Sequence, residues 1–274
     1  MAEEVRIARR LPTSRPVSYV TRRKLNFAEV FGLRFHNVDL DEAVDCIELL
    51  LRTNRHGLVL TPNTDHIVKL SRDSSFREAY RHAVMIVADG TPIIWASRLL
   101  GEPLKARVTG AALLPALCER AAEREWKLFF LGGKPGVAYR AATKLTEQFT
   151  GLNVVGTYAP PFGFESDRTE SQRIITKVRA ARPDILFVGV GAPKQEKWSA
   201  AHLEALDVPL ICCTGGAFDF AAGVVRRAPP WMQSLGLEWM FRLLQEPRRL
   251  WRRYLVDFLI FIPIVISAWG RKTA

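Results

Sequence analysis

The sequence predicts a Rossmann-like α/β fold: a mostly parallel sheet with helices on both faces, followed by a helical C-terminal appendage. Short strands that are apolar throughout alternate with amphipathic helical stretches, which is typical of a parallel sheet covered on both sides. A polar or glycine-rich loop follows each of five of these strands. The chain has 274 residues, 48% of them hydrophobic, which is enough for one large domain and an appendage.

The predicted strands and helices alternate regularly along the chain. A first helix is expected over residues 42–52, because Asp39 and Asp41 before it are typical of a helix start; a metal site at this Asp-x-Asp pair is the alternative. Strands are then predicted at residues 57–60, 84–88, 127–131, 154–158, 185–190 and 210–213. The predicted helices between them cover residues 66–82, 137–149, 171–181 and 197–206.

The loops after the strands predict the position of a site. In open parallel sheets, ligands bind beyond the carboxyl ends of the strands, so these loops are expected to gather at one edge. They read TPNTD (61–65), ADGTP (88–92), GGKPG (132–136), GAPKQE (191–196) and GGAFD (215–219). Their glycines and the helices that follow suit a phosphate. Neither GxGxxG nor GxxxxGK[ST] occurs, so a nucleotide-type ligand is expected without a dinucleotide or Walker fingerprint.

Several polar residues at this edge are candidates for chemistry. Asp89 ends an apolar strand, where partial desolvation raises the proton affinity of a carboxylate and suits a general base; a helix N-cap is the alternative. Arg107 is placed either to pair with phosphate or to face water. Thr61 and Asn63 offer a hydroxyl and an amide to a polar ligand, although such residues are also common in turns. Glu196 opens a helix, where capping alone accounts for it.

The charge of the chain is concentrated at its two ends. The net charge is +11, and residues 1–25 and 226–274 carry all of the excess, because the 200 residues between them hold 23 charges of each sign. A nucleic-acid enzyme more often carries a basic face on its folded body, so the ends are expected to meet another polyanionic surface, or to serve solubility alone. We therefore predict a flexible basic tail over residues 1–26, a core over 27–228 and an appendage over 229–274.

Cysteine usage and the N-terminus indicate a reducing compartment. The four cysteines lie in apolar runs without metal-ligand spacing, which predicts buried free thiols and no metal site. Residues 1–24 contain no apolar stretch of the kind that a signal peptide needs, so the protein is expected in the cytoplasm.

The C-terminal region combines an apolar segment with arginines. Residues 255–269 would form a helix of about 22 Å, shorter than the ~30 Å hydrocarbon core, so we expect a segment in the membrane interface; a helix packed on the protein's own core is the alternative. Upstream, Arg242, Arg249 and Arg252 are spaced to share one helical side, with a kink or restart at Pro247. For this arginine-bearing stretch, we favour a helix surface that docks on another surface over a basic face exposed to solvent.

Seven motifs, in order between residues 31 and 254, carry a family resemblance. They are TPNTDH, VADGTPI, RVTG, LFFLGG, GVGAPKQEKW, GGAFDFAAG and LEWMFRLLQEPRRLWRRY. Together they resemble the WecG/TagA/CpsF family of bacterial glycosyltransferases. The resemblance implies an inverting, metal-independent and cofactor-free transfer of N-acetylmannosamine, its uronic acid, or a related hexose or glucuronic acid. The donor would be a UDP-sugar and the acceptor an undecaprenyl-diphosphate-linked saccharide, in bacterial surface polysaccharide synthesis.

The resemblance also implies residue roles, partners and a location. Asp89 would be the catalytic base. The other implied contacts are to donor or acceptor for Thr61, Asn63, Arg107 and Gln195, to the nucleotide for Asp219, and to the diphosphate for Arg242, Arg249 and Arg252. The expected partners are the donor, the lipid-linked acceptor, an anionic membrane surface at the cytoplasmic face and, if the apolar appendage undocks, a second copy; no nucleic acid is expected. A nucleotide-binding Rossmann oxidoreductase and a non-catalytic polysaccharide-assembly protein are the alternatives.

Overall fold

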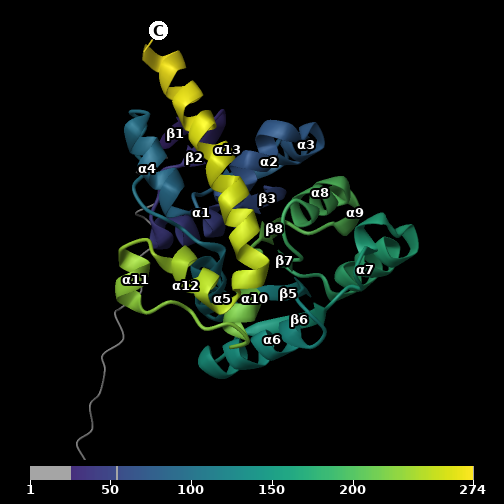
Figure 1. Cartoon of the computed structure of the whole chain (residues 1–274). Coiled ribbons are helices and arrows are strands. Elements are labelled where there is room, and N and C mark those ends of the chain that lie inside the picture. Colours follow the sequence, from purple (N-terminus) through teal and green to yellow (C-terminus); the bar gives the residue numbers. More distant parts are fainter. Residues whose placement is uncertain (1–25, 54, 274) are drawn as a thin grey trace, which may run out of the picture.

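A six-stranded parallel sheet forms the centre of the molecule (Figure 1). The computed structural model describes residues 26–53 and 55–273, without the side chains of residues 230, 234, 249, 272 and 273. The basic tail predicted over residues 1–26 lies outside the described residues, except for Asn26. The strand order is β4-β3-β8-β7-β5-β6, and every neighbouring pair is parallel. Helices flank the sheet on both sides, which confirms the predicted fold class.

The six strands are short, and the inner ones are apolar because both of their faces are buried. They are β3 (Gly57–Leu60), β4 (Ala83–Ile86), β5 (Lys127–Gly132), β6 (Asn153–Tyr158), β7 (Ile185–Gly189) and β8 (Leu210–Cys213). Successive side chains of a strand point to opposite faces, so Leu58 and Leu60 pack into one core while Val59 packs into the other. A strand between two cores has no polar side, which explains the continuous apolar runs in the sequence.

Two helical layers cover the sheet. One contains α1 (Leu40–Arg52), α5 (Gly110–Arg124), α6 (Val137–Gln148) and α10 (Ala217–Ala221). The other contains α2 (Thr64–Arg72), α3 (Ser74–Tyr80), α4 (Thr91–Leu99), η2 (Phe164–Ser166), α7 (Arg168–Ala181), α8 (Lys194–Ala201) and α9 (Leu203–Leu206). All four cysteines are buried and unpaired, as expected from their apolar surroundings.

Capping side chains decide where the helices begin and end. Asp39 is the N-cap of α1: its Oδ1 accepts from the Glu42 amide at 3.0 Å, which confirms the predicted helix start. The single helix expected over residues 66–82 is wrong. Asp73 has an extended backbone that ends α2, and its Oδ1 accepts from the Phe76 amide at 2.9 Å to start α3. The helix expected over residues 197–206 is likewise divided, at His202.

A β-hairpin that the sequence analysis did not predict lies beside the sheet. Strands β1 (Phe27–Val30) and β2 (Leu33–His36) pair antiparallel. The two residues between them, Phe31 and Gly32, have φ of 56° and 73°, as a tight hairpin turn requires. His36 Nδ1 accepts from the Ile86 amide of edge strand β4 at 3.4 Å. The hairpin therefore covers part of an edge that would otherwise be open to other chains.

The appendage consists of α11 (Pro230–Ser234), α12 (Glu238–Gln245) and α13 (Pro247–Thr273). The chain breaks between α12 and α13 at Glu246, before Pro247, as predicted. The expectation that the apolar segment is too short to cross a membrane is wrong on length and composition. The segment Leu250–Arg271 of α13 has 22 residues, or about 33 Å of helix, and contains an 18-residue stretch with a mean hydropathy of 1.6. It is longer because the helix continues through Pro263 and into the flanking residues.

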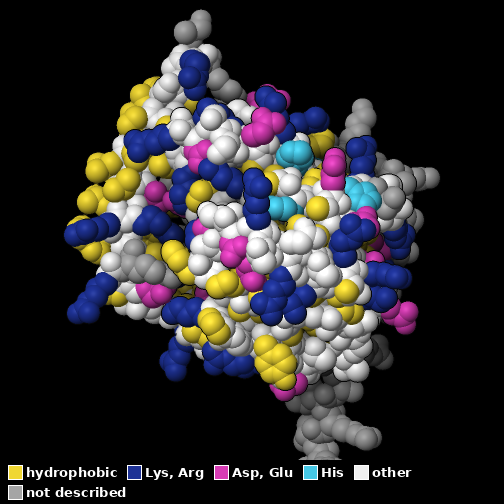
Figure 2. Space-filling view, turned by 90° about the vertical axis from the view of Figure 1, so that its right-hand side faces the viewer, with side chains coloured by type: hydrophobic (Ala, Val, Ile, Leu, Met, Phe, Trp, Pro, Cys, Tyr) yellow, Lys and Arg dark blue, Asp and Glu magenta, His cyan; other side chains and the backbone are white. Residues whose placement is uncertain are grey.

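Helix α13 has one packed face and one exposed apolar face. Asp257 and Phe261 are buried, and Phe261 lies 5.4 Å from the Phe31 ring of the hairpin. The exposed apolar side chains, each 40% or more accessible, are Trp251, Leu255, Val256, Phe258, Leu259, Ile262, Ile266 and Trp269. Helix α13 runs along the front of Figure 1, and Figure 2 shows hydrophobic side chains gathered along the corresponding left-hand edge, with basic side chains beside them.

Candidate active site

The loops after β5, β7 and β8 pack backbone against backbone at the carboxyl edge of the sheet. A Cβ atom on Gly132 would lie 2.5 Å from the Gly189 carbonyl oxygen, and one on Gly189 would lie 2.7 Å from the Gly215 carbonyl oxygen. Real Cβ atoms do not approach other atoms this closely, so glycine is required where these loops meet. The glycines of the three motifs therefore bring peptide groups of three adjacent strand ends close together.

Asp89 lies at this edge, after β4, and is held by two backbone interactions. Its amide donates to the Pro62 carbonyl at 2.9 Å, which ties it to the loop after β3. Its Oδ2 accepts from the Gly110 amide at 3.2 Å, at the first residue of α5. The helix that follows Asp89 is capped by Gly90, without a side-chain cap. The N-cap alternative for Asp89 is therefore wrong.

The surroundings of Asp89 favour its protonated form. Burial raises the pKa of Asp89 to about 6, against the hydrogen bond from Gly110 and the positive charge of Arg107, which lower it. The carboxylate of Glu238 raises this pKa further, and His66 lowers it slightly. A carboxylate with a pKa near 6 is deprotonated at neutral pH and still accepts a proton readily, which suits general-base chemistry.

Asn63 and His66 hold the loop after β3 in place. Asn63 is the N-cap of α2: its Oδ1 accepts from the His66 amide at 3.3 Å and lies 2.8 Å from His66 Nδ1. The other ring nitrogen of His66, Nε2, lies 3.2 Å from Glu196 Oε1. Thr61 is buried, and its hydroxyl donates to the Cys213 carbonyl at 3.4 Å. Asn63 therefore starts a helix and is not part of a turn, and a ligand contact by Thr61 or Asn63 stays a prediction.

Gln195 connects the loops after β7 and β8. Its Oε1 accepts from the amides of Gly191 and Gly215, both at 3.2 Å, and its Nε2 donates to Glu196 Oε1 at 2.7 Å. Glu196 is 1% exposed and does not cap α8, whose N-cap Pro193 makes no side-chain hydrogen bond, so the capping interpretation is wrong. Among the described residues, its Oε2 is buried without a hydrogen-bond partner. The sequence analysis missed that Glu196 and His66 form a buried pair behind the edge.

Arg107 joins the core to the appendage. Its Nη1 donates to Glu238 Oε2 at 3.0 Å, and its Nη2 to the Gln233 carbonyl at 3.5 Å. The other Glu238 oxygen, Oε1, accepts from Arg227 Nε at 3.4 Å. In this structure, Arg107 therefore contacts a carboxylate of the appendage, which neither expectation for it had included. The distance of 131 residues between Arg107 and Glu238 left no local signal of this pair.

Arg242 and Asp219 border the loop after β8. A Cβ atom on Gly216 would lie 3.7 Å from Asp219 Oδ2 and 3.8 Å from Arg242 Nη2. The Arg242 guanidinium carbon lies 5.3 Å above the Phe220 ring, and its Nη2 lies 3.9 Å from Glu246 Oε2. Its Nε is buried and, among the described residues, has no hydrogen-bond partner. Helix α12 thus places a guanidinium group at the carboxyl edge of the sheet.

The other two predicted arginines lie on a different helix. Arg242 belongs to α12, whereas Arg249 and Arg252 belong to α13, beyond the break at Glu246. The expectation that their spacing puts all three on one helical side is wrong, because the chain does not continue as one helix. Arg252 is exposed, and its guanidinium carbon lies 5.3 Å from the Trp251 ring. The side chain of Arg249 lies outside the described residues.

Charged side chains also line the junction of α13 with α2. Asp257 of α13 is 7% exposed and lies within electrostatic range of Asp65, Lys69 and Arg253. Lys69 Nζ donates to Asp65 Oδ2 at 2.5 Å and to the Ala192 carbonyl at 3.1 Å, so it links α2 to the loop after β7. Helix α13 therefore docks on the helix whose N-terminus forms part of the candidate site.

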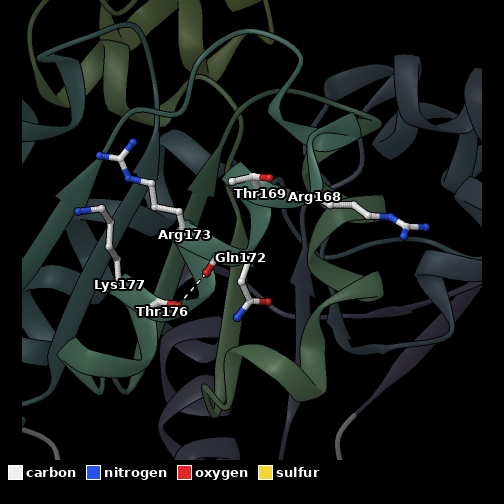
Figure 3. A pocket seen from close by; sticks show the side chains of 6 residues that line it. All are labelled: Arg168, Thr169, Gln172, Arg173, Thr176 and Lys177. Atoms are coloured by element: carbon white, nitrogen blue, oxygen red, sulfur yellow. Dashed lines mark hydrogen bonds between the residues drawn. The ribbon is translucent and has the colours of Figure 1, made fainter.

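Two depressions in the protein surface lie away from the candidate site. One open depression of about 650 Å³ lies along α7, where six of its side chains line it (Figure 3), and the Thr176 hydroxyl donates to the Gln172 carbonyl at 2.9 Å. Another, of about 550 Å³, includes Asp184 and Pro209, which precede β7 and β8 and mark the opposite end of the sheet. None of the predicted site residues lines either cavity.

No metal site is evident in the part of the chain that the structure describes. Over residues 26–53 and 55–273, no three His, Cys, Asp or Glu side chains come together as a set of metal ligands. Asp39 of the Asp-x-Asp pair is engaged as the cap of α1 and by Lys105, whose Nζ lies 2.5 Å from its Oδ2. Metal independence stays a prediction.

Comparison with known proteins gives a consistent result over almost the whole described chain. The model of the glycosyl transferase WecG/TagA/CpsF family matches residues 28–274. The chain is 30% identical over 224 residues to the N-acetylglucosaminyldiphosphoundecaprenol N-acetyl-beta-D-mannosaminyltransferase of Bacillus spizizenii, covering 81% of this chain and 84% of that protein. It is 26% identical over 226 residues to the protein of the same name from Staphylococcus aureus strain MW2, covering 82% and 87%.

Proposed function

Because the chain belongs to the WecG/TagA/CpsF family of glycosyl transferases, we propose that it transfers a sugar from a UDP-sugar to a saccharide on a polyprenyl diphosphate. The names of its relatives favour N-acetylmannosamine as the sugar and N-acetylglucosaminyl-diphosphoundecaprenol as the acceptor. A mannosaminuronic acid, a related hexose or glucuronic acid are the other sugars that we include. The product would enter the synthesis of a bacterial surface polysaccharide.

The observation that carries this proposal is the position of Asp89 at the carboxyl edge, with its pKa raised to about 6 by burial. As the acceptor hydroxyl oxygen attacks the anomeric carbon, Asp89 takes the hydroxyl proton. The attack comes from the face opposite UDP, so the configuration inverts. The bond between the anomeric carbon and the diphosphate oxygen breaks, and its electron pair leaves with UDP. A positioned general base of this kind typically contributes about 10²–10⁴-fold in rate.

The departing diphosphate needs positive charge around it. Arg242 of α12 lies beside the loop after β8, where Asp219 is proposed to contact the nucleotide. A charge-assisted hydrogen bond from such an arginine is worth about 1.5–3 kcal/mol. Thr61, Asn63, Arg107 and Gln195 are proposed to contact donor or acceptor. We extend the diphosphate contacts to Arg249 and Arg252 of α13.

The exposed apolar face of α13 is proposed to bind the membrane that holds the acceptor lipid. Arg248 precedes this face, Arg252 follows its first residue and Arg271 follows its last, which suits an anionic surface. Because the other face of α13 packs on α2 and the hairpin, we propose peripheral attachment at the cytoplasmic side rather than a span.

The test is turnover of UDP-sugars with a synthetic prenyl-diphosphate-linked N-acetylglucosamine as acceptor, in the presence of EDTA. Asp89→Asn is expected to lower kcat by about 10²–10⁴-fold. Asp184→Asn is a matched control, because Asp184 Oδ2 also accepts a backbone amide, that of Lys127 at 2.7 Å, at the opposite end of the sheet. Turnover of Asp89→Asn within a few-fold of the control would contradict the assignment of Asp89 as the base. Loss of wild-type activity in EDTA would contradict the metal-free mechanism.

A further inference from the structure

We propose that Glu238 is a positioning residue, which fastens α12 to residues 107–110 of the core and thereby holds Asp89 in its working geometry and charge environment. The inference rests on the proposed function, in which Asp89 is the base. It assigns to the appendage a task beyond membrane binding and diphosphate contacts. The appendage would complete the environment of the catalytic carboxylate itself.

Glu238 is held as a buried ion-paired carboxylate. It is the first residue of α12 and is 8% exposed. Each of its oxygens accepts from a different arginine, Oε2 from Arg107 at 3.0 Å and Oε1 from Arg227 at 3.4 Å. A buried charge is stable only when it is paired, so loss of the carboxylate leaves two guanidinium groups without their partner. This contact therefore fixes where α12 docks.

Both arginines lead to Asp89 through one short segment. Arg107 begins that segment, and the Nη2 atom of Arg227 lies 3.5 Å from the hydroxyl oxygen of Thr109. Thr109 is the N-cap of α5, and its hydroxyl oxygen accepts from the Ala112 amide at 3.1 Å. The next residue, Gly110, donates its amide to Asp89 Oδ2. Glu238 thus contacts this segment directly at Arg107 and, through Arg227, at Thr109, the residue before Gly110.

Glu238 also balances the charge around Asp89. The charged groups that act on Asp89 are Arg107 of residues 107–110, Glu238 of α12 and His66 of α2. Arg107 favours the carboxylate form of Asp89 and Glu238 opposes it, so the ion pair between them partly cancels the effect of Arg107. Without Glu238, the positive charge of Arg107 would be uncompensated. Asp89 would then hold a proton less strongly and be a weaker base.

Glu48 offers a matched control. It is 3% exposed on α1 and is also paired with arginines, because its carboxylate accepts from Arg120 and Arg124 of α5. Among the described residues, its ion-pair partners are Arg52, Arg120 and Arg124, none of which is Arg107. Glu48→Gln therefore disturbs a comparable buried cluster in the same chain, but one that does not reach the candidate site.

The experiment compares the full-length enzyme with Glu238→Gln, Glu238→Asp and Glu48→Gln in the transfer assay. For Glu238→Gln we expect kcat at pH 7 to fall roughly 100-fold through misplacement of the reacting groups. We expect the acidic limb of its pH–rate profile, where Asp89 becomes protonated, to move to lower pH. Glu238→Asp keeps the charge and should retain the wild-type limb, as should Glu48→Gln. A Glu238→Gln enzyme with the wild-type kcat and limb would overturn the inference.

Hydrogen–deuterium exchange gives a readout that does not depend on activity. Glu238→Gln should speed amide exchange over α12 and residues 107–110, whereas Glu48→Gln should speed it over α1 and the last turns of α5, near Arg120 and Arg124, and leave residues 107–110 unchanged. Unchanged exchange over α12 and residues 107–110 in Glu238→Gln would contradict the positioning role whatever the activity. Wild-type turnover by Asp89→Asn would instead contradict the proposed base, so the two failures are distinguishable.

Discussion

The carboxyl edge of the sheet and the C-terminal appendage are held together in different ways. At the edge, the loops after β5, β7 and β8 meet through peptide groups, with glycine where a Cβ would not fit, and the Gln195 side chain joins two of them. The appendage meets the core through a few charged side chains, Glu238 with Arg107 and Arg227 above all, and through one face of α13.

This difference separates a rigid part of the candidate site from a part whose docking depends on a few side chains. A scaffold built from backbone contacts has few alternative arrangements, so it can hold Asp89 and the glycine amides in fixed positions. A contact built from a few buried ion pairs depends on each of its members. Single substitutions should therefore distort the edge through steric clash, and should weaken the appendage through loss of charge.

A large effect on turnover is expected for Arg242→Ala, which removes the guanidinium group that α12 brings to the edge. Loss of one charge-assisted hydrogen bond to the diphosphate predicts a decrease in kcat of about 10–100-fold, with the fold intact. Arg226→Ala removes an exposed arginine of the same region as a control. Steady-state kinetics with saturating donor measure both, and equal rates for the two variants would contradict the role of Arg242.

Gly189→Ala tests the edge. Its Cβ would lie 2.7 Å from the Gly215 carbonyl oxygen and from the Phe218 ring, so we expect a loss of about 2–3 kcal/mol in the free energy of unfolding. Gly216→Ala is the control, since its Cβ would make only ordinary contacts, the nearest at 3.7 Å. Chemical denaturation measures the difference. Similar stabilities of the two variants would contradict the backbone packing of the loops.

Asp89→Asn is predicted to stabilise the protein while it lowers turnover by about 10²–10⁴-fold. Because the pKa of Asp89 is raised from 3.8 to about 6 on folding, its stabilising contribution is present in full below the unfolded value and is lost as the pH rises through 6. At pH 7 the charged carboxylate therefore costs about 3 kcal/mol, which the amide avoids. The gain should disappear near pH 4. Denaturation at both pH values measures it, and equal stability at pH 7 would contradict the raised pKa.

The smallest effect is expected on membrane binding. Leu259 is 62% exposed on α13, and burying a leucine in an apolar environment is worth about 1.5–3 kcal/mol. Leu259→Ser should weaken binding to anionic vesicles by about tenfold. Phe162→Ser, at a side chain 98% exposed on the core, should leave binding unchanged. Vesicle co-sedimentation compares the two, and equal binding would remove α13 from the membrane contact.

Sequence patterns predicted the parts of the fold that depend on local chemistry. The strands follow from apolar runs that end in glycine or polar loops, and the start of α1 follows from the acidic residues Asp39 and Asp41. Because parallel strands end at a common edge, the positions of Asp89 and Gln195 in the sequence were enough to place them there.

The parts of the fold and of the site that the sequence did not predict depend mainly on contacts between residues far apart in the chain. Glu238 meets Arg107 across 131 residues, so neither the charge nor the spacing of either residue revealed the pair. The hairpin was missed although Phe31 and Gly32 stand between two short alternating runs. Helix α13 was judged too short because only its most apolar residues were counted, whereas the helix continues into the arginines at both ends.

A structure of the enzyme with UDP and an acceptor analogue tests the central claim most directly. The account predicts one Asp89 carboxylate oxygen within about 3 Å of the acceptor hydroxyl and the Arg242 guanidinium on the diphosphate. An acceptor hydroxyl held by another base, with Asp89 still bound only to the Gly110 amide, would contradict it.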